Sequence, residues 1–441
     1  MLMENIRWAA SMEVRNCLPP DPLISNDWKE IWLARLEKAE PILTNWLSHS
    51  TRDQYWKHGS ICEDYSNVKA ATFLIGGYAD GYTNTVERTL RNIDCPKRAL
   101  IGPWVHLYPH IAVPGPQWGF CDEAVKWWDK HLGGKEMPEE PETIAFIQNS
   151  VPVPCPGVIE GRWVCDPQSE MKTWYLSDGK IGRQPGTGSV EICTPETCGA
   201  GVGAFFPVCL PDISLDQTSD DTLSCAFDTE PFTESTEILG RPVLTLSVAS
   251  DSAVANIFVR LCLIDPKGVS RLVSFSAQNL NHDVTHECVT PLTPDQFQTI
   301  DVQLDYIGER IDPGYKLRLC LSSACFPMFL PNPEHVTLTV DLSQCQLQIP
   351  VLVSSCPLPH DIPPIDTNRP ESYEVLRKPK QVKNTTIESD GRLVMEQLMD
   401  SGSRRVKGHG LIIDWVVEQT ESILPEDPTS AESNIQYEVL W

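Results

Sequence analysis

The pattern of apolar and polar positions divides the chain into four stretches, the first of which ends near residue 65. Within residues 1–65 apolar side chains recur at helical spacing, most clearly in one run: Trp28, Ile31, Trp32 and Leu36. Asp27 and Glu30 stand three apart at the start of that run, and this spacing predicts a capping box at the beginning of a helix. We expect the tryptophans to pack in a core. The alternative is a helical cap that lines a pocket.

Residues 66–140 alternate between short apolar runs and amphipathic stretches. The runs at 68–76 and 97–102 each end at a glycine and have the length of buried parallel strands. Residues 85–91 and 120–132 have apolar positions at helical spacing. The order of strand, helix, strand and helix predicts part of an α/β domain in which two strands of the sheet can be recognised.

From residue 141 to residue 352 the pattern is typical of strands. The prolines between residues 138 and 156 predict an irregular connection at the start of this stretch. Short runs rich in β-branched and aromatic residues then alternate with turns such as Asp265-Pro266-Lys267-Gly268, in which proline restricts φ and glycine supplies a left-handed residue. Many short strands separated by turns predict a β-sandwich, which we expect to be a jelly roll.

The last stretch, residues 353–441, combines a linker with a small β-rich extension. Prolines are frequent between residues 353 and 375, which predicts a linker. Short apolar runs near residues 385–387 and 411–415 indicate strands beyond it. The fold class predicted for the whole chain is therefore α/β followed by β.

Composition narrows the range of partners and compartments. The 441 residues include 60 Asp and Glu but 35 Lys and Arg, a formal net charge of -25. Such a charge repels the phosphates of nucleic acids and anionic lipid surfaces, so we expect neither as a partner. Glu4, Arg7 and Glu13 interrupt the start of the chain, which argues against a signal peptide, and no stretch reaches the roughly 18 apolar residues of a membrane span. We expect a cytoplasmic protein whose 16 cysteines are free thiols.

Two polar loops follow the two predicted parallel strands. Asp80 lies in the loop after the first strand, and His106 lies in the loop after the second. Sites in open parallel sheets form beyond the carboxyl ends of the strands, so the two side chains are expected at one edge of the sheet. An aspartate followed by a histidine matches the end of the α/β-hydrolase order Ser, Asp, His. In such a triad the carboxylate orients the imidazole, which takes the proton of the serine.

Three alternatives exist for these residues. Asp80 with Gly81 also suits a simple turn, and His106 can be a structural histidine. His110 lies four residues after His106, the spacing of a metal-binding pair on a helix. Prolines at positions 103, 109 and 114 disfavour a helix there, so we predict no metal site, and we predict no cofactor.

The loop sequences GGYADGYTN and LIGPWVHLYPH resemble paired motifs of the cocaine-esterase (CocE/NonD-type) and X-prolyl dipeptidyl-peptidase family of serine hydrolases. WWDKHLGG and VRLCLIDPKGVS are similar to later segments of that family, and the order is preserved across most of residues 1–350. The resemblance implies that Asp80 is the triad acid and His106 the general base. It also implies a helical cap at residues 1–65, the C-terminal part of a hydrolase domain at 66–140 and a jelly roll at 141–352. Tyr78 and Trp104 adjoin the two motifs and are expected to shape the substrate pocket, with packing as the alternative.

The nucleophile of such an enzyme is not found in the sequence. The serine of α/β-hydrolases lies in a G-x-S-x-G elbow, and no such pattern occurs among the 441 residues. The resemblance therefore implies the C-terminal portion of a dipeptidyl-peptidase or carboxylesterase, inactive as this chain, whose substrate would be a small ester or an X-Pro peptide. The alternative is a non-catalytic binding or interaction protein derived from such a hydrolase. Oligomeric state stays open, although a bare sheet edge would encourage association.

Overall fold

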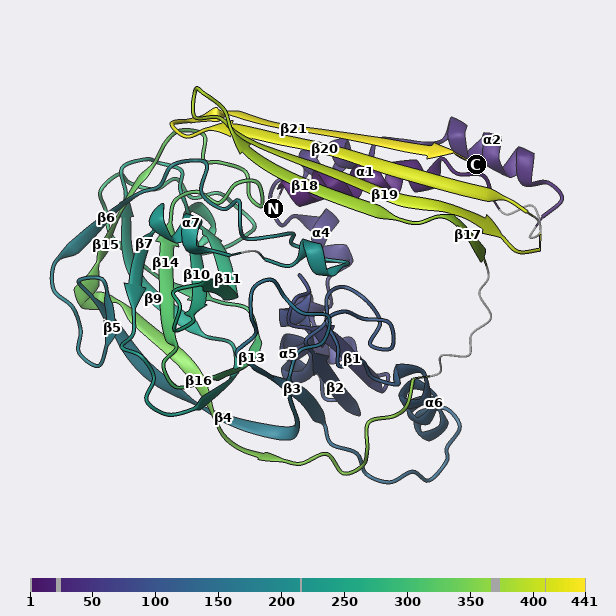
Figure 1. The fold of residues 1–441 in the computed structure, drawn as a ribbon, viewed down its shortest axis with the longest axis horizontal. Helices are drawn as coiled ribbons and strands as arrows, with labels where there is room; N and C mark the ends of the chain where they lie inside the picture. Colours follow the sequence, from purple (N-terminus) through teal and green to yellow (C-terminus); the bar gives the residue numbers. More distant parts are fainter. Residues whose placement is uncertain (1, 21–24, 215, 366–372, 409, 441) are drawn as a thin grey trace.

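The computed structural model describes residues 2–20, 25–214, 216–365, 373–408 and 410–440, and these form three parts (Figure 1). A group of N-terminal helices comes first in the chain. A large mixed sheet then runs from an α/β part into a β-sandwich. A separate antiparallel sheet made by the C-terminal residues extends over the rest of the molecule.

The N-terminal stretch is helical, as its pattern predicted. Its described residues form four α-helices and two 3-10 turns: α1 (Leu2–Asn16), α2 (Trp28–Glu37), α3 (Ile42–Ser48), α4 (Gln54–His58), η1 (Ile61–Glu63) and η2 (Tyr65–Asn67). The expected core packing is wrong here, because α2, α3 and α4 bury none of their residues. The capping box is wrong as well. Asp27 precedes α2 with φ -92° and ψ 22°, outside the extended region that directs a side chain toward the first turn, and its carboxylate caps no backbone N–H.

The α/β part contains one more parallel strand than the sequence indicated. Its elements are β1 (Thr72–Gly77), α5 (Thr83–Asn92), β2 (Lys97–Gly102), α6 (Phe120–His131) and β3 (Thr143–Asn149). β2 pairs in parallel with both β1 and β3, whereas β1 pairs with no other strand in the described ranges. The interpretation of residues 138–156 as an irregular connection missed β3, because the prolines flank this buried apolar strand and do not interrupt it.

β3 joins the α/β part to the sandwich. One edge of β3 pairs antiparallel with β4 (Gly161–Ser177), and the edge that pairs with β2 continues in parallel with β13 (Ile307–Ile311). The predicted domain boundary at residues 140 and 141 therefore precedes a strand that is hydrogen-bonded to both parts. The loops of the α/β part are consequently held against the sandwich by a continuous sheet.

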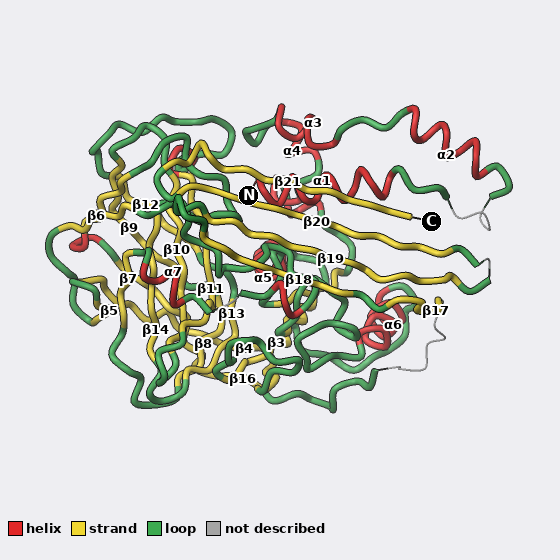
Figure 2. The backbone as a smooth tube through the Cα atoms, turned by 45° about the horizontal axis from the view of Figure 1, so that its top comes forward, coloured by secondary structure: helices red, strands yellow, loops and turns green. Residues whose placement is uncertain are grey.

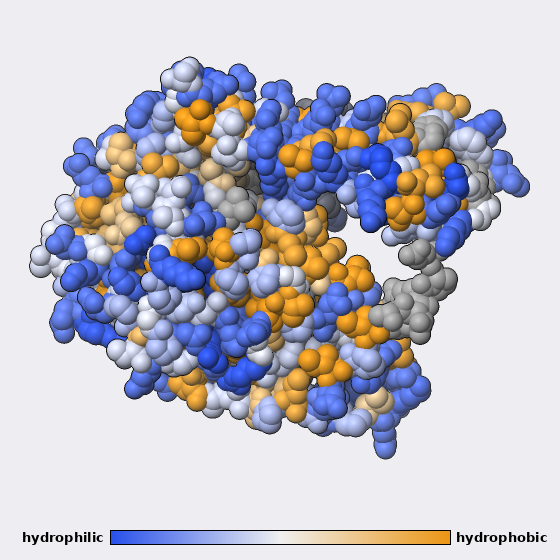
Figure 3. All heavy atoms as spheres, viewed as in Figure 1, coloured by the Kyte–Doolittle hydropathy of each residue, from blue (hydrophilic) through white to orange (hydrophobic). Residues whose placement is uncertain are grey.

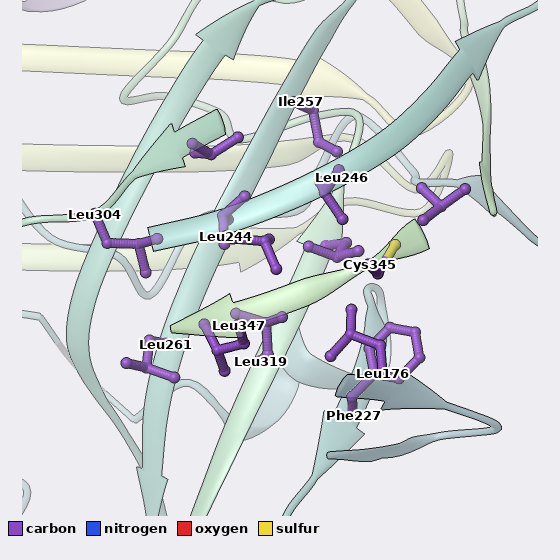
Figure 4. Close-up of a cluster of buried hydrophobic side chains, with 14 of the residues drawn as sticks. Leu176, Phe227, Leu244, Leu246, Ile257, Leu261, Leu304, Leu319, Cys345 and Leu347 are labelled. Carbon is purple, nitrogen blue, oxygen red and sulfur yellow. The ribbon is translucent and has the colours of Figure 1, made fainter. Parts of the chain in front are cut away.

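The sandwich strands enclose one large apolar core. The remaining strands are β5 (Lys180–Gly182), β6 (Ser189–Cys193), β7 (Cys225–Asp228), β8 (Thr236–Gly240), β9 (Val243–Ser250), β10 (Asn256–Ile264), β11 (Ser270–Asn279), β12 (Gln298–Gln303), β14 (Lys316–Ser322), β15 (Thr337–Asp341) and β16 (Gln346–Cys356), with a short helix α7 (Thr218–Thr222) before β7. Figure 4 shows side chains of β9, β10, β14 and β16 meeting in this core, with Leu244, Leu261, Leu319 and Leu347 fully buried. The turn predicted between β10 and β11 is confirmed, with Gly268 at φ +91°.

The C-terminal residues form a second sheet of five antiparallel strands. These are β17 (Tyr373–Arg377), β18 (Lys380–Ile387), β19 (Leu393–Val406), β20 (Ile412–Leu424) and β21 (Asp427–Leu440). Figures 1 and 2 show this sheet lying over the body with α1 beside β21, where Tyr437 Oη contacts the Arg7 carbonyl at 3.4 Å. Lys383 of β18 donates to the Pro211 carbonyl, which fastens the sheet to a sandwich loop. Part of the predicted linker, residues 366–372, lies outside the described residues.

No helix within the described ranges is both long enough and apolar enough to cross a lipid bilayer.

Candidate active site

Two glycines allow the loops after β1 and β2 to cross. Gly77 and Gly102 end the two strands and lie opposite each other in the parallel register. A Cβ on Gly77 would lie 2.0 Å from the Trp104 carbonyl oxygen, and one on Gly102 would lie 2.5 Å from the Trp104 ring. The backbone N–H groups of Tyr78 and Ala79 donate to the Gly102 and Trp104 carbonyls. The missing side chains therefore let the second loop pass directly over the end of β1.

This crossing brings Asp80 and His106 together. His106 Nδ1 lies 2.9 Å from Asp80 Oδ2, and the other carboxylate oxygen of Asp80 accepts the backbone N–H of Tyr82 at 2.9 Å. The Asp80 side chain is 12% exposed, whereas that of His106 is 45% exposed. A mostly buried carboxylate thus contacts Nδ1 of the imidazole, and Nε2 lies outside this contact.

Aromatic side chains from two different parts of the chain flank the His106 imidazole. Its ring centroid lies 5.6 Å from those of Tyr82 and Phe206, and these two rings lie 4.8 Å apart. The backbone N–H of His106 donates to the carbonyl of Pro207 at 2.9 Å. The Phe206–Pro207 segment belongs to the sandwich half of the chain, and sequence reasoning missed it. Only the adjacent pair Phe205-Phe206 in an otherwise Gly- and Cys-rich loop distinguishes it.

A cavity of about 120 Å³ lies beside Asp80, between the α/β loops and the sandwich. Tyr78 lines it, and the Tyr78 hydroxyl donates to the Phe146 carbonyl at 2.7 Å. Burial raises the pKa of Tyr78 well above its usual value, so this phenol is neutral. Trp104 is 1% exposed, is not among the lining residues and donates from Nε1 to the Pro116 carbonyl. Its position suits the packing alternative, because its ring fills the core under the crossing loop.

Ionisable groups of the sandwich complete the cavity wall. Burial raises the pKa of Asp305 to about 6, although Asn84 Nδ2 donates to its carboxylate at 2.6 Å. Asn84 Oδ1 accepts the Tyr306 backbone N–H, so this residue of α5 bridges to the sandwich. Arg271 also lines the cavity and lies 2.6 Å from the buried Glu309 carboxylate, whose pKa is raised by burial.

His110 does not share a helix with His106. The segment between β2 and α6 is not helical, as its prolines predicted. The His110 ring stacks with that of Phe120 at the start of α6, with centroids 6.1 Å apart. Throughout the part of the chain that the structure describes, no three His, Cys, Asp or Glu side chains are arranged to hold a metal ion.

Two family models match successive parts of the chain. The model of the X-Pro dipeptidyl-peptidase (S15 family) matches residues 6–108, which include Asp80 and His106. The model of the X-Pro dipeptidyl-peptidase C-terminal non-catalytic domain matches residues 160–357. Two proteins named as serine esterases, from Mycobacterium bovis and Mycobacterium tuberculosis, are each 23% identical to the chain over 332 residues. These alignments include 66% of this chain and 50% of the relatives, so the chain spans about half the length of the curated relatives it matches.

Solved structures share the fold at low sequence identity. An α-amino acid ester hydrolase aligns with a TM-score of 0.58 and 19% identity over 72% of this chain and 62% of its own. An aminopeptidase from the marine sediment archaeon Thaumarchaeota archaeon aligns with a TM-score of 0.57 and 16% identity. This alignment covers 73% of this chain and 62% of the aminopeptidase chain. A CocE/NonD family hydrolase from Staphylococcus aureus aligns with a TM-score of 0.54 and 14% identity. This alignment covers 74% of this chain and 62% of the hydrolase chain.

The chain therefore shares its fold with solved structures that are named as hydrolases. Over residues 6–108 and 160–357, the chain matches models of the X-Pro dipeptidyl-peptidase (S15) family and of its C-terminal domain, as its motifs predicted.

Proposed function

We propose that this chain carries the acid and the base of a serine hydrolase that cleaves a small ester or an X-Pro peptide. The 2.9 Å contact between Asp80 and His106 Nδ1 is the observation that supports it most directly. Asp80 accepts a hydrogen bond from Nδ1–H and holds the imidazole in the tautomer that leaves Nε2 unprotonated. Nε2 removes the proton of a serine hydroxyl as the oxygen attacks the scissile carbonyl, and returns that proton to the leaving group.

The serine and the oxyanion donors of this site would come from a segment that docks on β1. β1 uses one edge to pair with β2 and leaves its other edge unpaired within the described ranges. Open parallel edges are normally covered, because their N–H and C=O groups otherwise lack partners. Val125 and Trp128 of α6 are 53% and 57% exposed, and Leu132 at the C-cap of this helix is 83% exposed. Without a serine positioned at His106, we expect the printed chain alone to form no acyl-enzyme.

The family architecture supplies the remaining roles in this proposal. Helices α1–α4 correspond to the cap. The sandwich corresponds to the jelly roll, and its residues 271–275 line the cavity together with the loop after β1. The cavity beside Asp80 would receive the part of the substrate next to the scissile bond, with Tyr78 in its wall. The observation that favours the second candidate, a non-catalytic binding protein, is the absence of a G-x-S-x-G elbow from the printed sequence.

The test compares the 441-residue chain with a longer protein that carries additional residues before Met1. We expect the printed chain to hydrolyse p-nitrophenyl esters and X-Pro p-nitroanilides no faster than its His106→Ala variant. The extended product should react with a fluorophosphonate probe at a serine and lose about 10⁴-fold or more of its kcat on His106→Ala. His110→Ala, which alters a histidine of the same loop outside the Asp80 contact, is the matched control and should retain activity.

Two outcomes would contradict the proposal. Turnover by the printed chain that His106→Ala abolishes would show that a nucleophile is already present in it. An extended product that never reacts with the probe would favour the non-catalytic binding protein.

A further inference from the structure

A second pocket lies under the C-terminal sheet. The strands that form one side of this pocket lie outside the residues that the two family models match. It has a volume of about 100 Å³, which is room for several waters or a small organic group, since one water needs about 10–15 Å³. Four residues line both this pocket and the cavity beside Asp80, and so form the wall between them: Ala204, Phe205, Ile213 and Met328. The opposite wall comes from β18, β19 and β20, including Met395, Gln397, Gln419 and Glu421.

Two glutamines on the sheet side have polar atoms without partners. Gln419 is 7% exposed, and its Nε2 donates to Glu421 Oε1 at 2.7 Å. That bond sets the orientation of the Gln419 amide and leaves Oε1 buried with no hydrogen-bond partner among the described residues. Gln397 lies directly opposite Gln419 in the pairing of β19 with β20. Its Nε2 is also buried and unpartnered in the described part of the chain.

Polar atoms without a hydrogen-bond partner are unusual on the face of a strand that packs against the rest of the protein. Along β20 the same face carries Val417 and Ile423, which are almost completely buried. Gln381 and Lys383 of β18 share this face but are satisfied, because both donate to Asp212 or its neighbour Pro211. Buried polar atoms are nearly always hydrogen-bonded in folded proteins, so the two glutamines indicate a group that the chain itself does not provide.

The chemistry of the missing group follows from the two atoms. Gln419 Oε1 can accept a hydrogen bond and Gln397 Nε2 can donate one, and these two groups complement the N–H and C=O of an amide. Met395 and Met328 provide apolar surface beside them, and methionine adapts to ligands of varied shape. We propose that this pocket binds the neutral amide group of a small carboxamide or peptide, with its N–H on Gln419 and its carbonyl on Gln397. This site does not depend on the proposed hydrolytic function.

The experiment uses N-methylacetamide and the intact chain labelled with ¹³C at its methionine methyl groups. Titration should shift the Met328 and Met395 signals in a saturable manner. Gln397→Leu and Gln419→Leu each remove one hydrogen bond and should weaken binding about three- to tenfold. Methyl acetate has a similar shape but no N–H, and it should bind more weakly by the same factor. Gln436→Leu, on the exposed outer face of β21, is the matched control and should bind as the parent does.

Thermal unfolding in the absence of ligand separates a binding role from a structural one. Since Gln397 Nε2 has no partner to lose, Gln397→Leu should leave the midpoint unchanged or raise it. The proposal is overturned if the parent chain shows no saturable shift at Met328 and Met395. It is also overturned if both leucine variants bind as the parent does, or if Gln397→Leu lowers the unfolding midpoint while binding is lost.

Discussion

The sandwich and the N-terminal helices use similar apolar residues in opposite ways. In the sandwich, Leu261 and Leu319 are completely buried by strands of the same chain. In α2, Ile31 and Leu33 are 43% and 57% exposed. Figure 3 shows hydrophobic side chains on the visible surface near the far end of the C-terminal sheet and along the hollow between that sheet and the α/β part. The sandwich is therefore complete in itself, whereas the helices present apolar surface that suits a covering partner.

The largest difference in stability between the two regions is expected when one member of an ion pair is removed in each of them. Asp221 is buried in the sandwich, where it accepts from Arg260 Nη1 at 3.0 Å and from Arg318 Nη1 at 3.2 Å. Asp221→Ala leaves the buried Arg260 guanidinium without its carboxylate, so we expect a loss of about 3–5 kcal/mol in the free energy of unfolding. The exposed Arg52–Glu63 pair beside α4 should contribute at most about 1 kcal/mol, measured with Glu63→Ala. Urea denaturation followed by tryptophan fluorescence compares the two, and similar losses would show that both regions depend equally on such pairs.

A smaller effect is expected from truncating one leucine in each region. Leu319→Ala opens a cavity in a core that cannot fully relax, and we expect a loss of about 2–5 kcal/mol. Leu33→Ala removes a side chain that is already 57% exposed and should change stability by no more than about 0.5 kcal/mol. The same denaturation assay measures both. A large effect at Leu33 would mean that α2 is covered in solution, for example by a second copy of the chain.

The smallest predicted effect concerns Asp305, at the junction of the two regions. Its pKa is raised from 3.8 to about 6 in the folded chain, mainly by burial, with Asn84 and Arg241 opposing the shift. Between about pH 4 and pH 6 the folded state holds a proton that the unfolded chain has released, so this group's contribution to stability is lost as pH rises through that window. The loss is on the order of 1–3 kcal/mol.

The Asp305→Asn variant tests this sign. Relative to the parent, its unfolding temperature should rise between pH 4 and pH 7, because the variant has no carboxylate to ionise in the buried site. Asp178→Asn, at an exposed turn, controls for the loss of one negative charge. Parallel pH profiles for the parent and Asp305→Asn would mean that the Asp305 carboxylate titrates normally.

The sequence pattern correctly predicted those helices, strands and turns whose formation depends on residues that are neighbours in the chain. Strand β2 and helix α6 begin and end within a residue of their expected limits, and Gly268 adopts φ +91° in the turn expected between β10 and β11. These features need only apolar periodicity and the conformational freedom of glycine. β3 was missed because its apolar run lies between prolines, and the burial of α2 was predicted wrongly because an apolar stripe does not specify its partner.

The site was predictable in part for the same reason. Asp80 and His106 follow parallel strands, and the carboxyl ends of parallel strands meet at one edge. Phe206 comes from a loop about one hundred residues later in the chain, and the Gln397–Gln419 pair depends on the register of two long strands in the C-terminal sheet. No local pattern indicated either arrangement.

The sequence by itself predicted the resemblance to the family and the meeting of Asp80 with His106, because these depend on motifs and on short-range rules of chain geometry. Only the tertiary structure decided that the sheet continues through β3 into the sandwich, that α2 buries none of its residues and that two glutamines with buried, unpartnered atoms line a pocket. The physical reason is that burial and hydrogen-bond satisfaction are properties of the surroundings of a side chain, and those surroundings come from residues distant in the sequence.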